Sequence, residues 1–186
     1  MLSVVAALIP AMVVSFLVFG PRALVLEAVC VAASVLFEYL FRVIMCKRDN
    51  TVRDCSAIVT GLLLAFNLPV GIPLWMAVLG CAVAIIVTKQ LFGGIGQNFA
   101  NPAIVGRIFL LVSFGGQMTS WAAPQGYLGV DAVSGATPLA VLKSGAPLKE
   151  LPDMLNMLLG IRGGSVGETC IIALVIGGIF LIWKKV

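Results

Sequence analysis

Hydroxyl chemistry is possible in the segment 131–137, which reads Asp-Ala-Val-Ser-Gly-Ala-Thr. Ser-Gly-Ala-Thr is typical of a turn, and its two small residues leave the Thr137 hydroxyl open to a bulky partner. The chain contains no histidine, and no lysine lies close enough in the sequence to activate this hydroxyl as a nucleophile. We therefore expect Thr137 to be a poor catalytic nucleophile, and we assign no catalytic residue to the chain.

Two ionisable residues, Glu38 and Arg107, lie well inside apolar runs. An ionised side chain at membrane depth costs roughly 2.5–3.5 kcal/mol on insertion scales unless it is paired or hydrated, so both residues are candidate functional sites. For Glu38 the alternative is a structural ion pair with Arg42, one helical turn further on. Glu27 and Glu168 lie nearer the ends of their runs, where we expect a position at the membrane interface.

A polar, glycine-rich stretch at 89–102 contains Asn98 and Asn101. Together with the Asn-, Pro- and Gly-containing stretch 67–73, it interrupts short apolar runs, as happens where membrane helices break around a buried ligand. Ordinary tight turns between antiparallel helices would give the same spacing, and both interpretations stay open. A dinucleotide-binding loop at 94–96 is excluded, because the third glycine is absent and no strand precedes it.

The composition places these residues in a membrane protein. Of 186 residues, 61% are hydrophobic and 11% charged, and the mean hydropathy is +1.13, whereas a soluble surface carries roughly 25–35% charged residues. The net charge of +4 is scattered, without a run that would bind nucleic acid. The cysteines lack a metal-binding spacing, so we predict no metal site and interpret them as apolar packing residues. They are Cys30, Cys46, Cys55, Cys81 and Cys170.

We predict an all-α, polytopic integral membrane protein with about six transmembrane helices, some of them short or broken. The helices are expected at 1–20, 22–46, 56–68, 74–88, 102–118 and 168–183. Leucines at helical spacing between residues 148 and 158 further predict a short helix along the interface. The regions are then a five-helix transmembrane half (1–118), an extracytoplasmic loop with the interfacial helix (119–160), and a sixth helix (161–186).

The basic residues suggest an orientation. If the second helix ends in the cytoplasm, that side collects more lysine and arginine than the other, as the positive-inside rule requires. The cytoplasmic set is Lys47, Arg48, Arg53, Lys89, Lys184 and Lys185, and the outer set is Arg22, Lys143, Lys149 and Arg162. This bias predicts that the polar loop 119–149 lies outside.

Four segments carry a resemblance to a known family. The Asp-x-x-Ser-Gly-Ala-Thr motif resembles the site at which a flavin transferase attaches FMN to threonine through a phosphoester bond, with FAD as donor. Three further segments, at 59–69, 92–103 and 164–169, match in the same order. Over essentially its whole length, the chain resembles the D subunits of the Rnf complexes, which are ion-translocating ferredoxin:NAD⁺ oxidoreductases. It resembles more distantly the B subunit of the Na⁺-translocating NADH:quinone reductase.

The resemblance implies a covalent FMN on Thr137. It also implies that a flavin transferase recognises the preceding residues, which are Asp131, Ser134, Gly135 and Ala136. Ala132 stands where the family often has glycine, a small change that we expect to be tolerated.

Two further sites follow from the resemblance. In the quinone-reductase relative, the Gly-x-Asn-x-x-Asn-Pro stretch lies by a second, non-covalent riboflavin, which implies a flavin near Asn98 and Asn101 on the cytoplasmic side. We include Arg107 among the candidate cofactor-binding residues. An acid at the position of Glu38 is linked in that relative to cation uptake, so Glu38 is the candidate for ion coupling.

The implied function is that of an electron-transfer subunit in the plasma or inner membrane, coupling electron flow to cation or proton translocation. Its implied partners are the A, B, C, E and G subunits of Rnf, the flavin transferase and membrane lipid. Family members are longer and have two inverted halves, so we expect this chain to be a truncated form with the first part of that fold. Two alternatives stay open on the residues alone: an inverted-repeat solute transporter or channel without flavin, and a purely structural membrane subunit.

Overall fold

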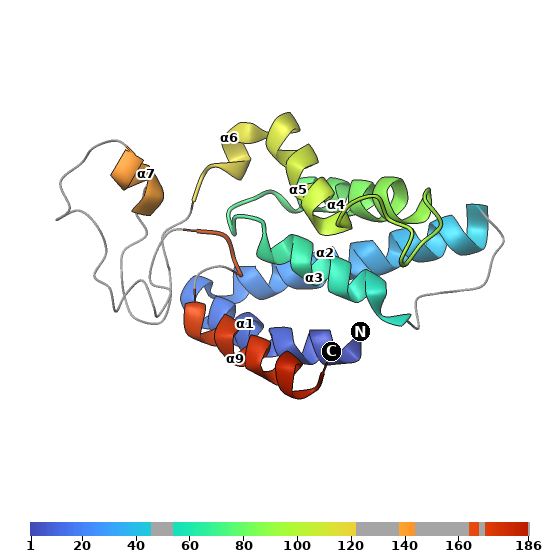
Figure 1. Ribbon diagram of the computed structural model, residues 1–186. Coiled ribbons are helices and arrows are strands. Elements are labelled where there is room, and N and C mark those ends of the chain that lie inside the picture. Colours follow the sequence, from blue (N-terminus) through green and yellow to red (C-terminus); the bar gives the residue numbers. More distant parts are fainter. Residues whose placement is uncertain (46–53, 122–137, 144–163, 168–169, 186) are drawn as a thin grey trace.

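The computed structural model describes residues 1–45, 54–121, 138–143, 164–167 and 170–185, which form helices and connecting turns without any strand (Figure 1). The all-α prediction is therefore confirmed. The helices are α1 (Leu2–Phe19), α2 (Pro21–Tyr39), the π-helix η1 (Leu40–Met45), α3 (Ser56–Phe66), α4 (Leu74–Ala82), the π-helix η3 (Val83–Gln90), α5 (Pro102–Ser113), α6 (Gly115–Met118), α7 (Pro138–Lys143) and α9 (Ile171–Trp183).

Helix lengths agree with the prediction of short and long membrane helices. Leu2–Phe19 and the continuous helix Pro21–Met45 are long and apolar enough to cross a bilayer, and Ser56–Phe66, Leu74–Gln90, Pro102–Ser113 and Ile171–Trp183 are shorter apolar helices of 10–17 residues. At a rise of about 1.5 Å per residue, a helix as short as α3 spans only about half of a 30 Å hydrocarbon core. The loops around α3 must therefore cross the remaining part of the hydrocarbon core.

The predicted break between the first two helices is confirmed. Gly20 ends α1 with φ of 75°, a left-handed backbone conformation that favours glycine. Pro21 then occupies the first position of α2, where its missing N–H costs no hydrogen bond.

The fifth helix is shorter than predicted. We expected it to continue to Met118, but α5 ends at Ser113, because Phe114 leaves the helical conformation with φ of −134° and ψ of 46°. The residues that follow form the single-turn helix α6. The predicted interfacial helix between residues 148 and 158 lies outside the described residues.

The helices from α1 to α5 alternate in direction, with η1 continuing α2 and η3 continuing α4. One cavity is lined by Met1 at the start of α1, Ser56 at the start of α3, Lys89 near the end of η3 and Asn101 before α5. These ends therefore meet at one end of the bundle, which we call the Met1 end. Helix α9 lies antiparallel beside α1 (Figure 1), where the α carbon of Gly177 packs against the Ala7 carbonyl.

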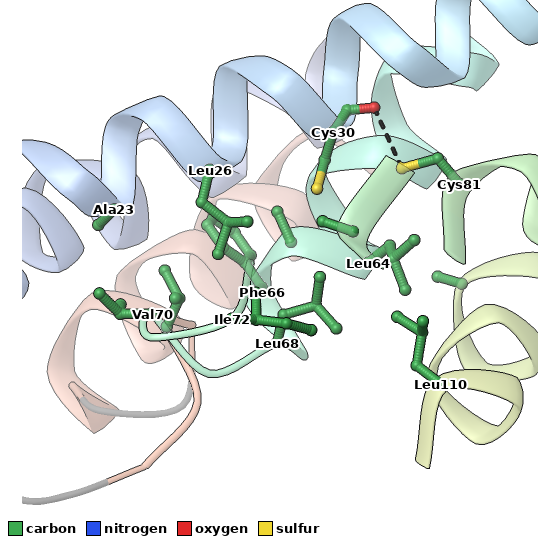
Figure 2. Close-up of a cluster of buried hydrophobic side chains, with 14 of the residues drawn as sticks. Ala23, Leu26, Cys30, Leu64, Phe66, Leu68, Val70, Ile72, Cys81 and Leu110 are labelled. Atoms are coloured by element: carbon green, nitrogen blue, oxygen red, sulfur yellow. Dashed lines mark hydrogen bonds between the residues drawn. The ribbon is translucent and has the colours of Figure 1, made fainter. Parts of the chain in front are cut away.

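The core forms around α2, which packs against α1, α3, α4 and η3. Figure 2 shows Leu26, Leu64 and Leu110 converging from three helices, and each is fully buried. In the same core the Cys81 thiol donates to the Cys30 carbonyl oxygen at 3.5 Å. These two cysteines therefore have the packing role that the sequence predicted.

Close approach of α2 and α3 depends on Gly61. A Cβ atom at this position would lie 2.8 Å from the Cys30 carbonyl oxygen and 2.9 Å from the Ser34 Oγ. Small residues at helix interfaces allow such contacts in membrane proteins, where helix packing is a main source of stability.

We predict that Gly61→Ala destabilises the bundle by about 1–3 kcal/mol, because α3 must move away from α2 to relieve the overlap. The matched control is Gly178→Ala on α9, where an added Cβ meets no atom within 4 Å and alanine favours the helix. Thermal unfolding in detergent should show a lower Tm for Gly61→Ala alone. Equal Tm values for the two variants would contradict the tight α2–α3 contact.

Candidate functional site

The central feature of the site is a buried ion pair between Glu38 and Lys89. Glu38 lies in the last turn of α2, Lys89 near the end of η3, and Ser56 at the start of α3. The Lys89 Nζ donates to Glu38 Oε2 and to Ser56 Oγ, both at 2.6 Å. The side chains of Lys89 and Glu38 are only 2% and 1% exposed, so the pair is removed from solvent.

Both helices change their winding beside this pair. The end of α2 continues as the π-helix η1 directly after Tyr39, and α4 continues as η3. At the end of η3 the Leu91 N–H donates to the Ile86 carbonyl five residues earlier, at 3.1 Å. Such widened turns occur frequently at functional sites, and here η3 carries Lys89 to the carboxylate.

The pair corrects two sequence predictions. Glu38 is paired with Lys89 and not with Arg42, the alternative considered from the sequence. Lys89 itself was assigned to a cytoplasmic loop, whereas it lies inside a helix and is buried. Because the net contribution of a buried ion pair to folding is small or unfavourable, its position favours a functional interpretation.

A cavity of about 420 Å³ opens at the Met1 end, and Ser56, Lys89, Asn98 and Asn101 are among its lining residues. The structure thus brings both predicted asparagines to the same cavity as the lysine of the ion pair. Asn98 Oδ1 is buried and has no hydrogen-bond partner in the described part of the chain. Asn101 Oδ1 accepts from the Ala103 N–H at 3.0 Å and so caps α5.

Arg107 lies elsewhere. From α5 its guanidinium Nη1 donates to Asn67 Oδ1 at 2.7 Å, and the Asn67 amide donates to the Leu63 carbonyl at 2.7 Å. Arg107 therefore joins α5 to the C-terminal end of α3. It is not among the residues that line the cavity of Asn98 and Asn101.

The remaining predicted site residues are those of the hydroxyl motif, and all of them lie outside the described residues. They are Asp131, Ser134, Gly135, Ala136 and Thr137.

Glu27 is a buried residue whose burial the sequence did not predict. We expected it at the membrane interface, and its side chain is 1% exposed inside the bundle. The Ser15 Oγ of α1 lies 2.7 Å from Glu27 Oε1. Burial of this residue depends on the packing of α1, which the position of Glu27 within its apolar run does not reveal.

The helices and their buried charges define an all-α integral membrane protein with ionisable groups inside its helical bundle. The chain belongs to the NQR2, RnfD, RnfE family, whose family model matches residues 1–186.

Three relatives show how far the similarity extends. The chain is 47% identical over 189 residues to the D subunit of the Na⁺-translocating ferredoxin:NAD⁺ oxidoreductase complex of Acetobacterium woodii. It is 43% identical over 192 residues to the D subunit of the proton-translocating complex of Clostridium ljungdahlii, and 38% identical over 217 residues to the D subunit of the ion-translocating oxidoreductase complex of Rhodobacter capsulatus. Each match covers 100% of this chain but only 58%, 57% and 59% of the relative.

Proposed function

We propose that this chain acts as the D subunit of an ion-translocating ferredoxin:NAD⁺ oxidoreductase in the plasma or inner membrane. The observation that carries the proposal is the 47% identity, over the whole chain, to a relative named as that subunit. The proposal includes the A, B, C, E and G subunits of Rnf as partners. It also includes a flavin transferase that attaches FMN to Thr137 in an extracytoplasmic loop.

When it is bound, FMN would supply the electron-transfer chemistry. The threonine oxygen of Thr137 would hold the phosphoryl group, and Asp131, Ser134, Gly135 and Ala136 would be recognised by the transferase. These residues would fix the position of the cofactor, and the membrane helices of the chain would anchor the loop.

We assign a second, non-covalent flavin to the cavity at the Met1 end. Its volume of about 420 Å³ is within the usual range of small-molecule sites, roughly 300–1,000 Å³. The unpartnered Asn98 Oδ1 would accept a hydrogen bond from a ring N–H. Asn101 supports the site by keeping the start of α5 in place, and we assign it a positioning role.

Ion coupling would use the Glu38–Lys89 pair. A cation that enters from the Met1 end would compete with the Lys89 ammonium for the Glu38 carboxylate, because both are attracted to the same oxygens. Cation uptake would therefore require Lys89 to move away from Glu38. Because Lys89 also lines the adjacent cavity, this movement would link cation binding to the charge in that cavity.

Intact-mass measurement of the purified chain, produced together with a flavin transferase, tests the flavin proposal. The expected mass exceeds that of the polypeptide by one FMN less one water, the difference for a phosphoester. An unmodified mass would contradict it. Solute uptake by vesicles that contain the chain without flavin would instead support the transporter alternative.

We predict that Glu38→Gln reduces the factor by which Na⁺ or H⁺ stimulates electron transfer by about tenfold or more. This is a typical magnitude for energetic coupling between two sites. The measurement is ferredoxin:NAD⁺ electron transfer in membranes that contain the whole complex, at varied Na⁺ concentration and pH. Glu38→Asp, which keeps the carboxylate, should retain part of the dependence. Unchanged ion dependence in Glu38→Gln, with normal flavin content, would exclude Glu38 from coupling.

A further inference from the structure

The carboxyl group of Glu27 lies apart from the Glu38–Lys89 pair. The two acids are separated by about three turns of α2, or roughly 16 Å at 1.5 Å per residue. Glu27 Oε1 lies 2.7 Å from the Ser15 Oγ, whereas Oε2 is buried without a hydrogen-bond partner in the part of the chain that the structure describes. This carboxyl therefore lacks the ammonium that neutralises Glu38.

The contacts of Ser15 depend on the protonation of Glu27. The Ser15 Oγ lies 2.8 Å from the Met12 carbonyl oxygen as well as 2.7 Å from Glu27 Oε1. A hydroxyl has one proton to donate, and a carbonyl or a carboxylate can only accept. If Glu27 is ionised, the single Ser15 proton must be shared between two acceptors, whereas a carboxylic acid supplies the second proton and allows two full hydrogen bonds.

The surroundings of Glu27 favour the same neutral state. It lines a cavity of about 490 Å³ between α1, α2 and α3, and the other walls of this cavity are apolar, including Ile9, Met12, Leu24, Val31, Ile58 and Leu62. An ionised carboxylate in such surroundings is costly without a partner.

Within the part of the chain that the structure describes, the elements packed against Glu27 bring no cation to it. The sequences of α1, α3, α4 and α9 contain no charged residue. On α2, Arg22 donates to the carbonyl oxygens of Val70 and Gly71, and the nearest titratable side chain is the Cys30 thiol. Lys89 of η3 is held by Glu38.

We propose that Glu27 is a proton-binding site inside the helical bundle, accessible through the apolar cavity. Glu27 is hydrogen-bonded to Ser15, and Ser15 is hydrogen-bonded to the Met12 carbonyl oxygen. The site is distinct from Glu38 and does not depend on flavin binding. Its ligand is a proton, because the cavity offers too few oxygen atoms to replace the water shell of a metal cation.

Dicyclohexylcarbodiimide, an apolar reagent that reacts with protonated carboxyl groups, provides the test. The acid proton passes to a carbodiimide nitrogen, the carboxyl oxygen bonds to the central carbon, and rearrangement gives a stable N-acylurea. With the full chain in lipid vesicles, peptide mass spectrometry should locate the adduct on Glu27, and labelling should decline as the pH rises. Glu27→Gln should lose the adduct, whereas Gly178→Ala on α9, where an added Cβ meets no atom within 4 Å, should be labelled as the unchanged chain is.

A water-soluble carbodiimide is the matched reagent control and should leave Glu27 unlabelled. An adduct on Glu38 instead, or protection of Glu27 by Na⁺ at constant pH, would overturn the proposal. Infrared spectroscopy of the unmodified chain gives an independent measurement that does not require the reagent to enter. The carbonyl band of a protonated carboxyl group should be present, and absent in Glu27→Gln; a spectrum without this difference would also overturn the proposal.

Discussion

Replacement of Lys89 by methionine is expected to destabilise the protein by about 3–5 kcal/mol, the usual cost of removing one partner from a buried ion pair. Methionine fills a similar volume, so the main change is loss of the ammonium that lies 2.6 Å from Glu38 and from Ser56. The carboxylate of Glu38, itself only 1% exposed, would then lack this positive charge. Chemical or thermal unfolding in detergent, together with the amount of protein in the membrane, measures the effect.

Two further variants separate the ion pair from a general effect of charge. Glu38→Gln combined with Lys89→Met should recover most of the lost stability, because the buried carboxylate charge is removed together with the ammonium. Arg42→Gln removes a positive charge one turn from Glu38 but should alter stability little, since the structure pairs Glu38 with Lys89. If Arg42→Gln were as damaging as Lys89→Met, the observed pairing would be refuted.

Thr137→Ala is expected to abolish covalent flavin attachment. A phosphoester needs the threonine oxygen, and alanine provides no atom that could replace it. Protein produced with a flavin transferase and denatured in SDS should give a fluorescent band for the unchanged chain and none for Thr137→Ala. Electron transfer through the complex should be lost at the same time, because the proposed covalent carrier would be missing.

The matched control for this experiment is Thr119→Ala. The Thr119 hydroxyl is exposed and donates to the Gly115 carbonyl oxygen at 2.8 Å in the turn after α6, outside the transferase motif. Its removal should leave the fluorescent band intact. A band that persists in Thr137→Ala would place the flavin on another residue.

Much of the fold could be predicted, because apolar runs and helix-breaking residues act locally. Gly20 and Pro21 end one helix and begin the next, and Asn101 and Pro102 start α5 with a capping side chain and a proline at the first position. The end of α5 was wrong for an equally local reason. Phe114 continues the apolar run while its backbone leaves the helix, and the prediction ran past Gly115 and Gly116, which are a helix-ending signal directly after it.

The site was less predictable, because its contacts join distant parts of the chain. Glu38 was identified as a charge within an apolar run, but its partner Lys89 is 51 residues away and follows directly on another apolar run. The π-helical winding that brings the lysine into place leaves no recognised sequence pattern. Asn98 and Asn101 were found by their motif, and the structure adds that they share a cavity with Lys89.

The π-helical winding of η3 sets the direction in which the Lys89 side chain points. One residue of an ordinary α-helix corresponds to about 100° of rotation around the axis, so conversion of a single π turn to an α turn would rotate the Lys89 side chain by about that angle. Such a twist would carry the ammonium away from Glu38. The contact between Lys89 and Glu38 therefore depends on the π-helical winding of η3.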